Sequence, residues 1–221
     1  MSDKKKTVVL LRGGIDSAIC LADAVEERGK ENVVALYLYY GQVHKKEKAA
    51  AKRLAEYYRV EYMEMDISKV MSFSQSKALA DHVSKDESDY SDKKAEVPFR
   101  NGLMISVAAS VALSIGADSV RMAVHADESA GRVYPDKRES FLRTMAAAVN
   151  EGTDGELKLI LPFADMSKKQ VMMHGVKLGV PFAHTWSCYE SDNEPCGYCV
   201  GCKGRAAAFK LIDEEDPLLK K

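Results

Sequence analysis

Four of the five cysteines lie close together near the end of the sequence. Cys188, Cys196, Cys199 and Cys202 have the spacing C-x7-C-x2-C-x2-C. Close C-x2-C pairs let two sulfurs reach one ion from a tight turn, and four soft thiolate ligands favour structural zinc. An iron–sulfur cluster and free or redox-active cysteines are the alternatives. Zinc with four protein ligands has no open position, so we expect it to fold the tail and not to catalyse.

A second chemical pattern follows the first apolar run. Residues 11–17 read L-R-G-G-I-D-S. Adjacent glycines let the backbone turn sharply, and the start of a following helix offers N–H groups and a positive dipole end that suit phosphate. Ser17 adds a hydroxyl donor, whereas Asp16 repels phosphate unless it binds a cation or caps the helix. A plain strand-to-helix turn capped by Asp16 or Ser17 is the alternative. The pattern matches neither the Walker nor the dinucleotide-binding fingerprint.

The elements that position these residues alternate along the chain. Strands are predicted at residues 7–11, 32–39, 60–65, 119–124 and 157–161, and helices at 17–28, 44–58, 101–115, 138–150 and 167–178. This alternation predicts an α/β fold with a doubly wound parallel sheet covered on both faces. The pattern does not give the order of the strands. We divide the chain into an α/β domain at residues 1–185 and a small C-terminal zinc-binding tail with a helix at 186–221.

Two further segments stand out. Residues 74–96 are polar, mixed in charge and long for a plain connection, so we expect a mobile loop or lid there. The helix predicted at 101–115 is apolar on nearly every face, which places it in the core or at a subunit contact.

Composition limits the class of protein. The 221 residues are 46% hydrophobic and 29% charged, the ordinary mix of a globular protein. The formal net charge of −1 comes from 32 Lys+Arg and 33 Asp+Glu, so no general attraction to nucleic acid or membrane is indicated. No export signal or membrane span is visible, and we expect a cytoplasmic protein. A reducing compartment favours metal binding or catalysis over disulfides for the cysteines.

Both chemical patterns together resemble one enzyme family. Residues 11–17 resemble the S-G-G-x-D-S pyrophosphate loop (PP-loop) of the N-type ATP pyrophosphatases. Tyr40-Gly41-Gln42 with His44 and Glu47 resembles the Y-G-Q-x-H-x-x-E segment of the 7-cyano-7-deazaguanine synthase (QueC) family. Residues 97–101 are similar to its V-P-x-R-N, residues 134–141 to its Y-P-D-C-R-x-x-F, and the cysteines followed by Arg205 to its zinc tail. These blocks cover nearly the whole chain.

The resemblance implies a fold and a reaction. The fold is that of the adenine nucleotide α-hydrolase-like, PP-loop proteins, and the enzyme class is an ATP-dependent C–N ligase. The family converts 7-carboxy-7-deazaguanine and ammonia to 7-cyano-7-deazaguanine: ATP adenylates the carboxylate, ammonia displaces AMP, and the amide oxygen is activated again and lost. Implied cofactors are ATP, Mg²⁺ to neutralise pyrophosphate, and structural Zn²⁺. We expect small-molecule substrates, a homodimer, and no nucleic-acid or membrane partner.

The resemblance also implies site residues. The catalytic candidates are Asp16, Ser17, Arg100 and Lys169. The nucleotide-binding candidates are Leu11, Arg12, Gly13, Gly14, Ile15, Asp16, Ser17, Ala18, Ile19, Cys20 and Leu21. The substrate-binding candidates are Tyr40, Gln42, Arg100, His125, Tyr134, Asp136 and Arg138; the arginines suit a carboxylate or pyrophosphate. His125 follows the fourth predicted strand, where open α/β sheets place ligands. The alternatives are core roles for Tyr40 and Cys20, packing for His125 and a solvated charge for Arg100.

Two positions depart from the family motifs. Arg12 stands where the family loop has serine, and Lys137 stands where the family has cysteine. Arg12 either points to solvent and leaves the loop intact, alters or ends the ATP chemistry, or marks an engineered change. Lys137 adds a charge near the proposed purine pocket. The alternative function is a variant that stops at the amide, transfers the activated deazapurine to another amine, or binds nucleotide without turnover.

Overall fold

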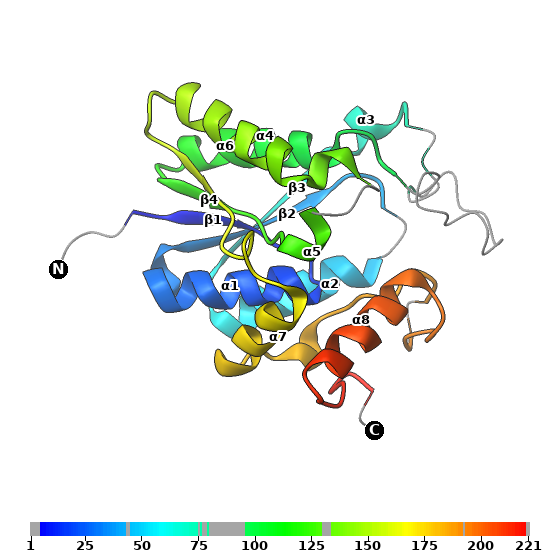
Figure 1. Cartoon of the computed structure of the whole chain (residues 1–221). Helices are drawn as coiled ribbons and strands as arrows, with labels where there is room; N and C mark the ends of the chain where they lie inside the picture. The colour runs from blue at the N-terminus through cyan, green and yellow to red at the C-terminus, as the bar shows by residue number, and fades with distance from the viewer. Residues whose placement is uncertain are drawn as a thin grey trace.

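Five parallel strands form the centre of the molecule (Figure 1). The computed structural model describes residues 5–42, 45–74, 76, 79, 96–129, 134–191 and 193–219. The strands are β1 (Thr7–Leu10), β2 (Val33–Tyr39), β3 (Glu61–Asp66), β4 (Ser119–Arg121) and β5 (Lys158–Ile160). Their order is β3-β2-β1-β4-β5, so β1 lies at the centre with Val9 opposite Ala35 and Arg121. The predicted parallel sheet is confirmed.

Helices cover both faces of this sheet, as Figure 1 shows. One face carries α4 (Arg100–Ser114) and α6 (Glu139–Glu151), and the other carries α1 (Ile15–Arg28), α2 (Lys45–Tyr58), α7 (Lys168–Lys177) and α8 (Val200–Leu211). The shorter elements are η1 (Lys30–Asn32), α3 (Ser68–Met71), α5 (Ala126–Ser129), η4 (Pro135–Lys137) and η5 (Phe182–His184). Among the described residues, no helix is long and apolar enough to cross a membrane.

Alternating side chains of β1 explain the two covered faces. Val8 and Leu10 pack in the hydrophobic layer beneath α4 and α6, whereas Val9 and Leu11 pack in the layer beneath α1 and α2. Strands buried on both faces are typical of parallel sheets covered by crossover helices. The apolar helix predicted at 101–115 is α4, and Ile105 is fully buried against the sheet.

Several element ends differ from the predictions by a few residues. β4 was expected to continue to residue 124 but ends at Arg121, because residues 122–125 leave the sheet and line a pocket. The first helix begins at Ile15 and not at 17. Most of the lid predicted at 74–96 lies outside the described residues, as does His44.

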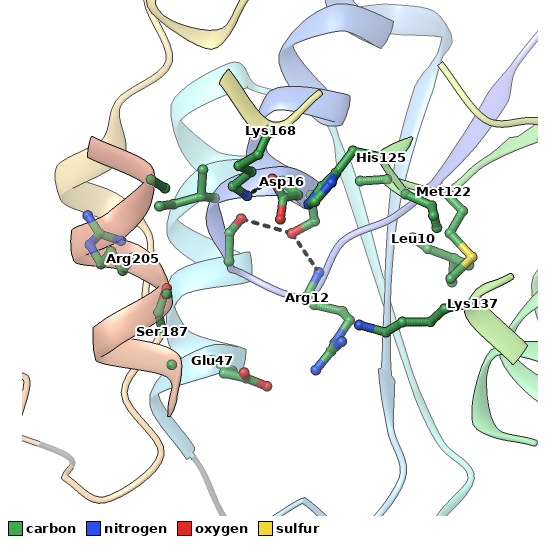
Figure 2. A pocket seen from close by; sticks show the side chains of 18 of the residues that line it. Leu10, Arg12, Asp16, Glu47, Met122, His125, Lys137, Lys168, Ser187 and Arg205 are labelled. Atoms are coloured by element: carbon green, nitrogen blue, oxygen red, sulfur yellow. Dashed lines mark hydrogen bonds and ion pairs between the residues drawn. The ribbon is translucent and has the colours of Figure 1, made fainter. Parts of the chain in front are cut away.

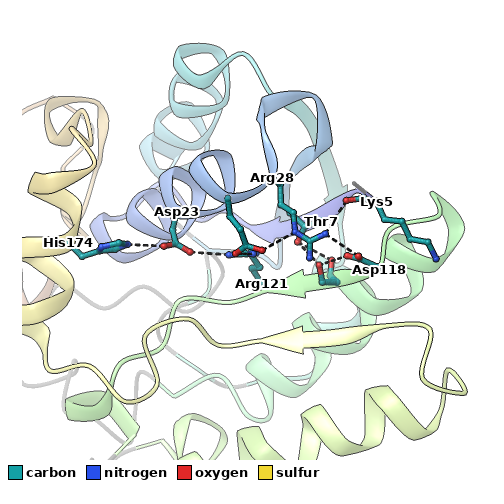
Figure 3. A network of polar contacts seen from close by, with 9 residues as sticks. Lys5, Thr7, Asp23, Arg28, Asp118, Arg121 and His174 are labelled. Atoms are coloured by element: carbon teal, nitrogen blue, oxygen red, sulfur yellow. Dashed lines mark hydrogen bonds and ion pairs between the residues drawn. The ribbon is translucent and has the colours of Figure 1, made fainter. Parts of the chain in front are cut away.

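An ionic network around the buried Arg121 fixes α1 relative to the sheet (Figure 3). Arg121 in β4 is only 1% exposed and forms ion pairs with Asp23, at 3.0 Å, and with Glu27. The same Asp23 carboxylate lies 2.8 Å from Nε2 of His174 in α7. A buried charge is tolerated when it is paired and hydrogen-bonded. The network therefore ties β4, α1 and α7 together. Arg121, His174 and the two α1 carboxylates lie far apart in the sequence, and no local motif links them.

The C-terminal tail packs against the α/β domain through another buried arginine. Arg205 of α8 is 4% exposed, binds both carboxylate oxygens of Asp216 at 2.6 and 2.7 Å, and donates to the Phe182 carbonyl at 3.0 Å. Phe209 joins the hydrophobic layer shared by α1 and α7. These contacts hold α8 beside the pocket described next, and the division at residues 185 and 186 stays a prediction.

Candidate active site

A pocket of about 520 Å³ opens at the carboxyl ends of β1 and β4 (Figure 2). The strand order reverses between these two strands, because β1 connects outward to β2 on one side and has β4 on the other. Ligands of open α/β sheets bind at such switch points. Several elements line the pocket: the starts of α1 and α7, η4 and α8, together with residues 122–125, Asp127, residues 186–187 and Tyr189. It therefore joins distant parts of the sequence in one site.

The turn before α1 leaves backbone donors for a ligand. Gly14 is the N-cap of α1, and no side chain caps the helix. The hydroxyl of Ser17 donates to the Gly14 carbonyl at 3.0 Å and accepts from the Arg12 N–H at 3.2 Å. The predicted alternative of an Asp16 or Ser17 cap is therefore wrong. Uncapped N–H groups at a helix start form an anion site, so the geometry suits phosphate.

Close packing holds the turn in place. Gly13 has φ +86°, and a Cβ added there would lie 2.3 Å from the Glu47 carbonyl oxygen and 2.9 Å from the Ala51 nitrogen. The Gly13 carbonyl accepts a hydrogen bond from the backbone N–H of Trp186 at 2.9 Å. Only glycine fits between α2 and the tail in this conformation.

A lysine from α7 meets the start of α1. Lys168 forms an ion pair with Asp16, and its backbone N–H donates to Oδ2 of Asp127 at 2.7 Å. All three residues line the pocket, whereas the predicted Lys169 is exposed and lies outside the lining. A capping box of Ser167 and Gln170 sets this helix start. The S-x-x-Q spacing is a sequence signal that would have placed Lys168 first in the helix.

Two arginines converge on one buried tyrosine. Nη2 of Arg12 and Nη1 of Arg100 lie 3.5 and 3.2 Å from the hydroxyl of Tyr40. The Tyr40 ring is 3% exposed and belongs to the core beneath α4. Its hydroxyl thus positions both guanidinium groups at the edge of the pocket. Tyr40 and Arg100 do not themselves line the pocket.

A buried acid and a tyrosine face the same region. Glu47 lines the pocket and is 6% exposed. Burial raises the pKa of its carboxyl, and the nearby Arg12 and Arg100 partly oppose that shift. Burial, together with Glu47, also raises the pKa of Tyr189 to about 12, so its hydroxyl stays protonated near neutral pH. In the sequence Glu47 is marked only by the motif that contains it, and no local pattern marks Tyr189.

Most of the other predicted substrate contacts lie outside the lining of the pocket. Gln42 accepts from the Tyr40 N–H and donates to the Tyr37 hydroxyl, both at 2.8 Å. Asp136 accepts from the Asn101 N–H at 2.8 Å, at the start of α4. Neither side chain lines the pocket, and the same holds for the half-buried Tyr134 and the exposed Arg138. His125 does line it and is 6% exposed.

The predicted nucleotide-binding segment divides into two groups. Arg12, Gly14, Ile15, Asp16 and Ser17 line the pocket. The other side chains of this segment are fully buried in the core beside α1: Leu11, Ala18, Ile19, Cys20 and Leu21. Burial raises the pKa of the Cys20 thiol to about 12, so this cysteine behaves as a small core residue.

Four cysteines of the tail form a candidate metal site. The sulfurs of Cys188, Cys196, Cys199 and Cys202 all lie within 4.8 Å of one another. Backbone N–H groups of Glu190 and Cys196 donate to the Cys188 sulfur at 3.4 Å, which suits thiolate ligands. Trp186 Nε1 donates to the Cys188 carbonyl at 3.1 Å, so the metal site adjoins residues that line the pocket.

Solved structures share this fold. The chain is similar to NMN synthetase from Francisella tularensis, with a TM-score of 0.56, 17% identity, and coverage of 96% of this chain and 79% of that chain. It is also similar to the NH3-dependent NAD synthetase from Campylobacter jejuni, with a TM-score of 0.51, 18% identity, and coverage of 81% and 66%. At these identities the likeness shows the fold alone, which is the PP-loop α/β fold.

Sequence comparison gives the family. Residues 6–213 match the model described as "Queuosine biosynthesis protein QueC". The chain is 37% identical to the 7-cyano-7-deazaguanine synthase of Archaeoglobus fulgidus, over 97% of this chain and 90% of that protein. It is 35% identical to the Brucella anthropi protein of the same name, over 97% and 93%. The chain belongs to the QueC family, which confirms the resemblance seen in its motifs.

Proposed function

We propose that this chain is a 7-cyano-7-deazaguanine synthase, an ATP-dependent C–N ligase. Its substrates are then 7-carboxy-7-deazaguanine, ammonia and ATP. The observation that carries the proposal is the uncapped start of α1 at the β1–β4 switch point, in a chain whose residues 6–213 match the QueC family. No comparison favours a variant that stops at the amide or only binds nucleotide.

The start of α1 suits the polyphosphate of ATP. Backbone N–H groups after Gly14 and the ammonium of Lys168 provide positive partners for phosphate oxygens. A carboxylate is a poor electrophile at neutral pH; its oxygen attacks the α-phosphate of ATP, pyrophosphate leaves, and ammonia then displaces AMP from the acyl carbon. Positive charge beside the departing pyrophosphate stabilises the adenylation step.

Two carboxylates fit the proposed magnesium ion. Asp16 and Asp127 both line the pocket, and Lys168 contacts both. Mg²⁺ prefers carboxylate and phosphate oxygens, so these residues would hold it next to the nucleotide. When bound, Mg²⁺ neutralises charge on the phosphates. We expect His125, which follows β4 and lines the pocket, to contact the substrate.

Zinc is the metal that the four cysteines fit best. Four sulfurs around one Zn²⁺ at about 2.3 Å lie about 3.8 Å apart. The sulfurs of Cys196 and Cys202 are 3.9 Å apart, and the whole set lies within 4.8 Å. An iron–sulfur cluster distributes its thiolates over separate irons and needs a wider set. The homodimer and the cytoplasmic location are untested and stay predictions.

The test is a reaction with mass detection of the products. Purified protein is mixed with ATP, Mg²⁺, ammonia and 7-carboxy-7-deazaguanine, and pyrophosphate release is followed beside an Arg12→Ser variant. We expect the unmodified protein to yield the nitrile. An amide as the final product would replace the nitrile synthase with the alternative that stops at the amide. Absence of pyrophosphate release from both proteins would refute the proposed substrate.

A further inference from the structure

Three cationic side chains from different elements lie near one side of the pocket, and two of them, Arg12 and Lys137, line it. Arg12 follows β1, Arg100 begins α4 and Lys137 ends η4. Arg12 and Arg100 reach the same Tyr40 hydroxyl, at 3.5 and 3.2 Å. Lys137 and Arg12 both line the pocket, and Figure 2 shows the Lys137 side chain extending toward Arg12.

This group lies apart from the proposed polyphosphate site. Figure 2 shows Lys168 and Asp16 together at the start of α1, whereas the Arg12 guanidinium extends away from them, on the side of Lys137. A phosphate bound at the uncapped start of α1 would therefore contact Lys168 and not the Arg12 guanidinium. Arg12 and Lys137 line the remaining part of the pocket, where we place the second substrate.

Cations that face the same pocket attract an anion bound between them. Burial raises the pKa of the neighbouring Glu47 carboxyl, and Arg12 and Arg100 oppose that shift. The protonated hydroxyl of Tyr189 adds a further hydrogen-bond donor that lines the pocket.

We propose that Arg12 and Lys137 form an anion subsite that binds the carboxylate of the deazaguanine substrate. This inference rests on the proposed function. A guanidinium and an ammonium favour a carboxylate over a neutral amide of the same shape. Arg12 and Lys137 are thus specificity-determining residues that distinguish the acid from the amide that replaces it during the reaction. Both positions carry small neutral residues in the family motifs that the chain resembles.

The test measures binding of two ligands that differ in one charge. Dissociation constants of 7-carboxy-7-deazaguanine and its 7-amide are determined by calorimetry, without ATP, for the unmodified protein, Arg12→Ser, Lys137→Cys and the double variant. A charge-assisted hydrogen bond lost from a carboxylate corresponds to about a tenfold or larger loss of affinity. We expect that loss for the acid with each single variant, and little change for the amide.

Matched variants separate the subsite from general effects. Lys52→Ser removes a positive charge from an exposed position on α2 and should leave both constants unchanged. Arg12→Lys and Lys137→Arg keep the charge and should retain most of the affinity for the acid. Unchanged amide binding also shows that a variant is folded.

Other outcomes overturn the inference in distinguishable ways. Equal weakening of acid and amide would mean that the two residues only shape the pocket. Weaker binding of MgATP with unchanged binding of the acid would assign them to the polyphosphate. If the unmodified protein makes the nitrile while the variants keep their affinity for the acid, the subsite fails and the proposed function stands. If the unmodified protein binds neither deazaguanine, both fail.

Discussion

The ammonium of Lys168 pairs with the carboxylate of Asp16, although the two residues are 152 positions apart in the chain. The pair joins the first turn of α7 to the first turn of α1, on the side of the pocket where we place the polyphosphate. It therefore sets the charge and the position of the groups that would meet ATP. The next residue, Lys169, is exposed and has no place in this arrangement.

Replacing Lys168 should therefore affect turnover far more than replacing Lys169. We expect Lys168→Met to lower kcat/KM for ATP by about 100-fold or more, the effect of removing one preorganised donor from developing charge. Lys169→Met should change it by less than about threefold, because an exposed lysine contributes little. Pyrophosphate release with both variants measures the difference. Equal losses, or a larger loss at Lys169, would contradict the assignment.

Adding a methyl group at Gly13, in the turn before α1, should destabilise the folded protein. Gly13→Ala places a Cβ against backbone atoms of Glu47 and Ala51 at a positive φ. We expect a loss of about 3 kcal/mol or more in the free energy of unfolding. Gly179→Ala is the control, because Gly179 has φ +64° but no atom within 4 Å of an added Cβ, and it should lose only about 1 kcal/mol. Urea denaturation of both variants measures the two losses. Similar losses would contradict the close packing of Gly13 against α2.

Metal removal should disorganise the tail. Trp186 is the single tryptophan and bonds to the Cys188 carbonyl, so its fluorescence reports on the metal site. We expect one zinc per chain by metal analysis, and a fluorescence change with a lower Tm after chelation or in Cys196→Ser. Cys20→Ala, in the core of α1, should keep the full zinc content. Iron at about four atoms per chain would instead indicate a cluster.

The pH dependence of stability should carry a contribution from Glu47. Burial raises its pKa above the ordinary value of 4.5, so above pH 4.5 the folded protein binds more protons than the unfolded chain. The free energy of unfolding then falls as pH rises through the folded-state pKa. Glu47→Gln removes this term, so its stability relative to the unmodified protein should improve with rising pH above 4.5.

Unfolding curves between pH 4 and 8 measure this difference. Glu56→Gln, on the exposed side of the same helix, is the matched control. Its free energy of unfolding should change with pH in parallel with that of the unmodified protein. A Glu47→Gln curve that also runs parallel would show that the carboxyl titrates alike in the folded and unfolded chains.

Much of the fold was predictable because its signals are local. Alternation of apolar runs with amphipathic ones predicted the parallel sheet, and the spacing of four cysteines predicted their cluster. The glycine pair predicted the turn before α1, and the motifs indicated the family that the comparisons then gave. Each of these depends on residues that are close in sequence, where periodicity and chain geometry act directly.

The tertiary structure decided what meets across long separations. Strand order brings β4 beside β1 and places residues 122–127 next to the glycine turn. The start of α7 places Lys168 in the lining of the pocket, whereas the adjacent Lys169 is exposed. Tyr40, Gln42 and Asp136 are buried, and they support residues near the pocket instead of lining it. Packing alone brings Arg12 and Lys137 to one pocket. A sequence fixes which groups are available, but their relative positions depend on the docking of helices on a sheet, which no local pattern encodes.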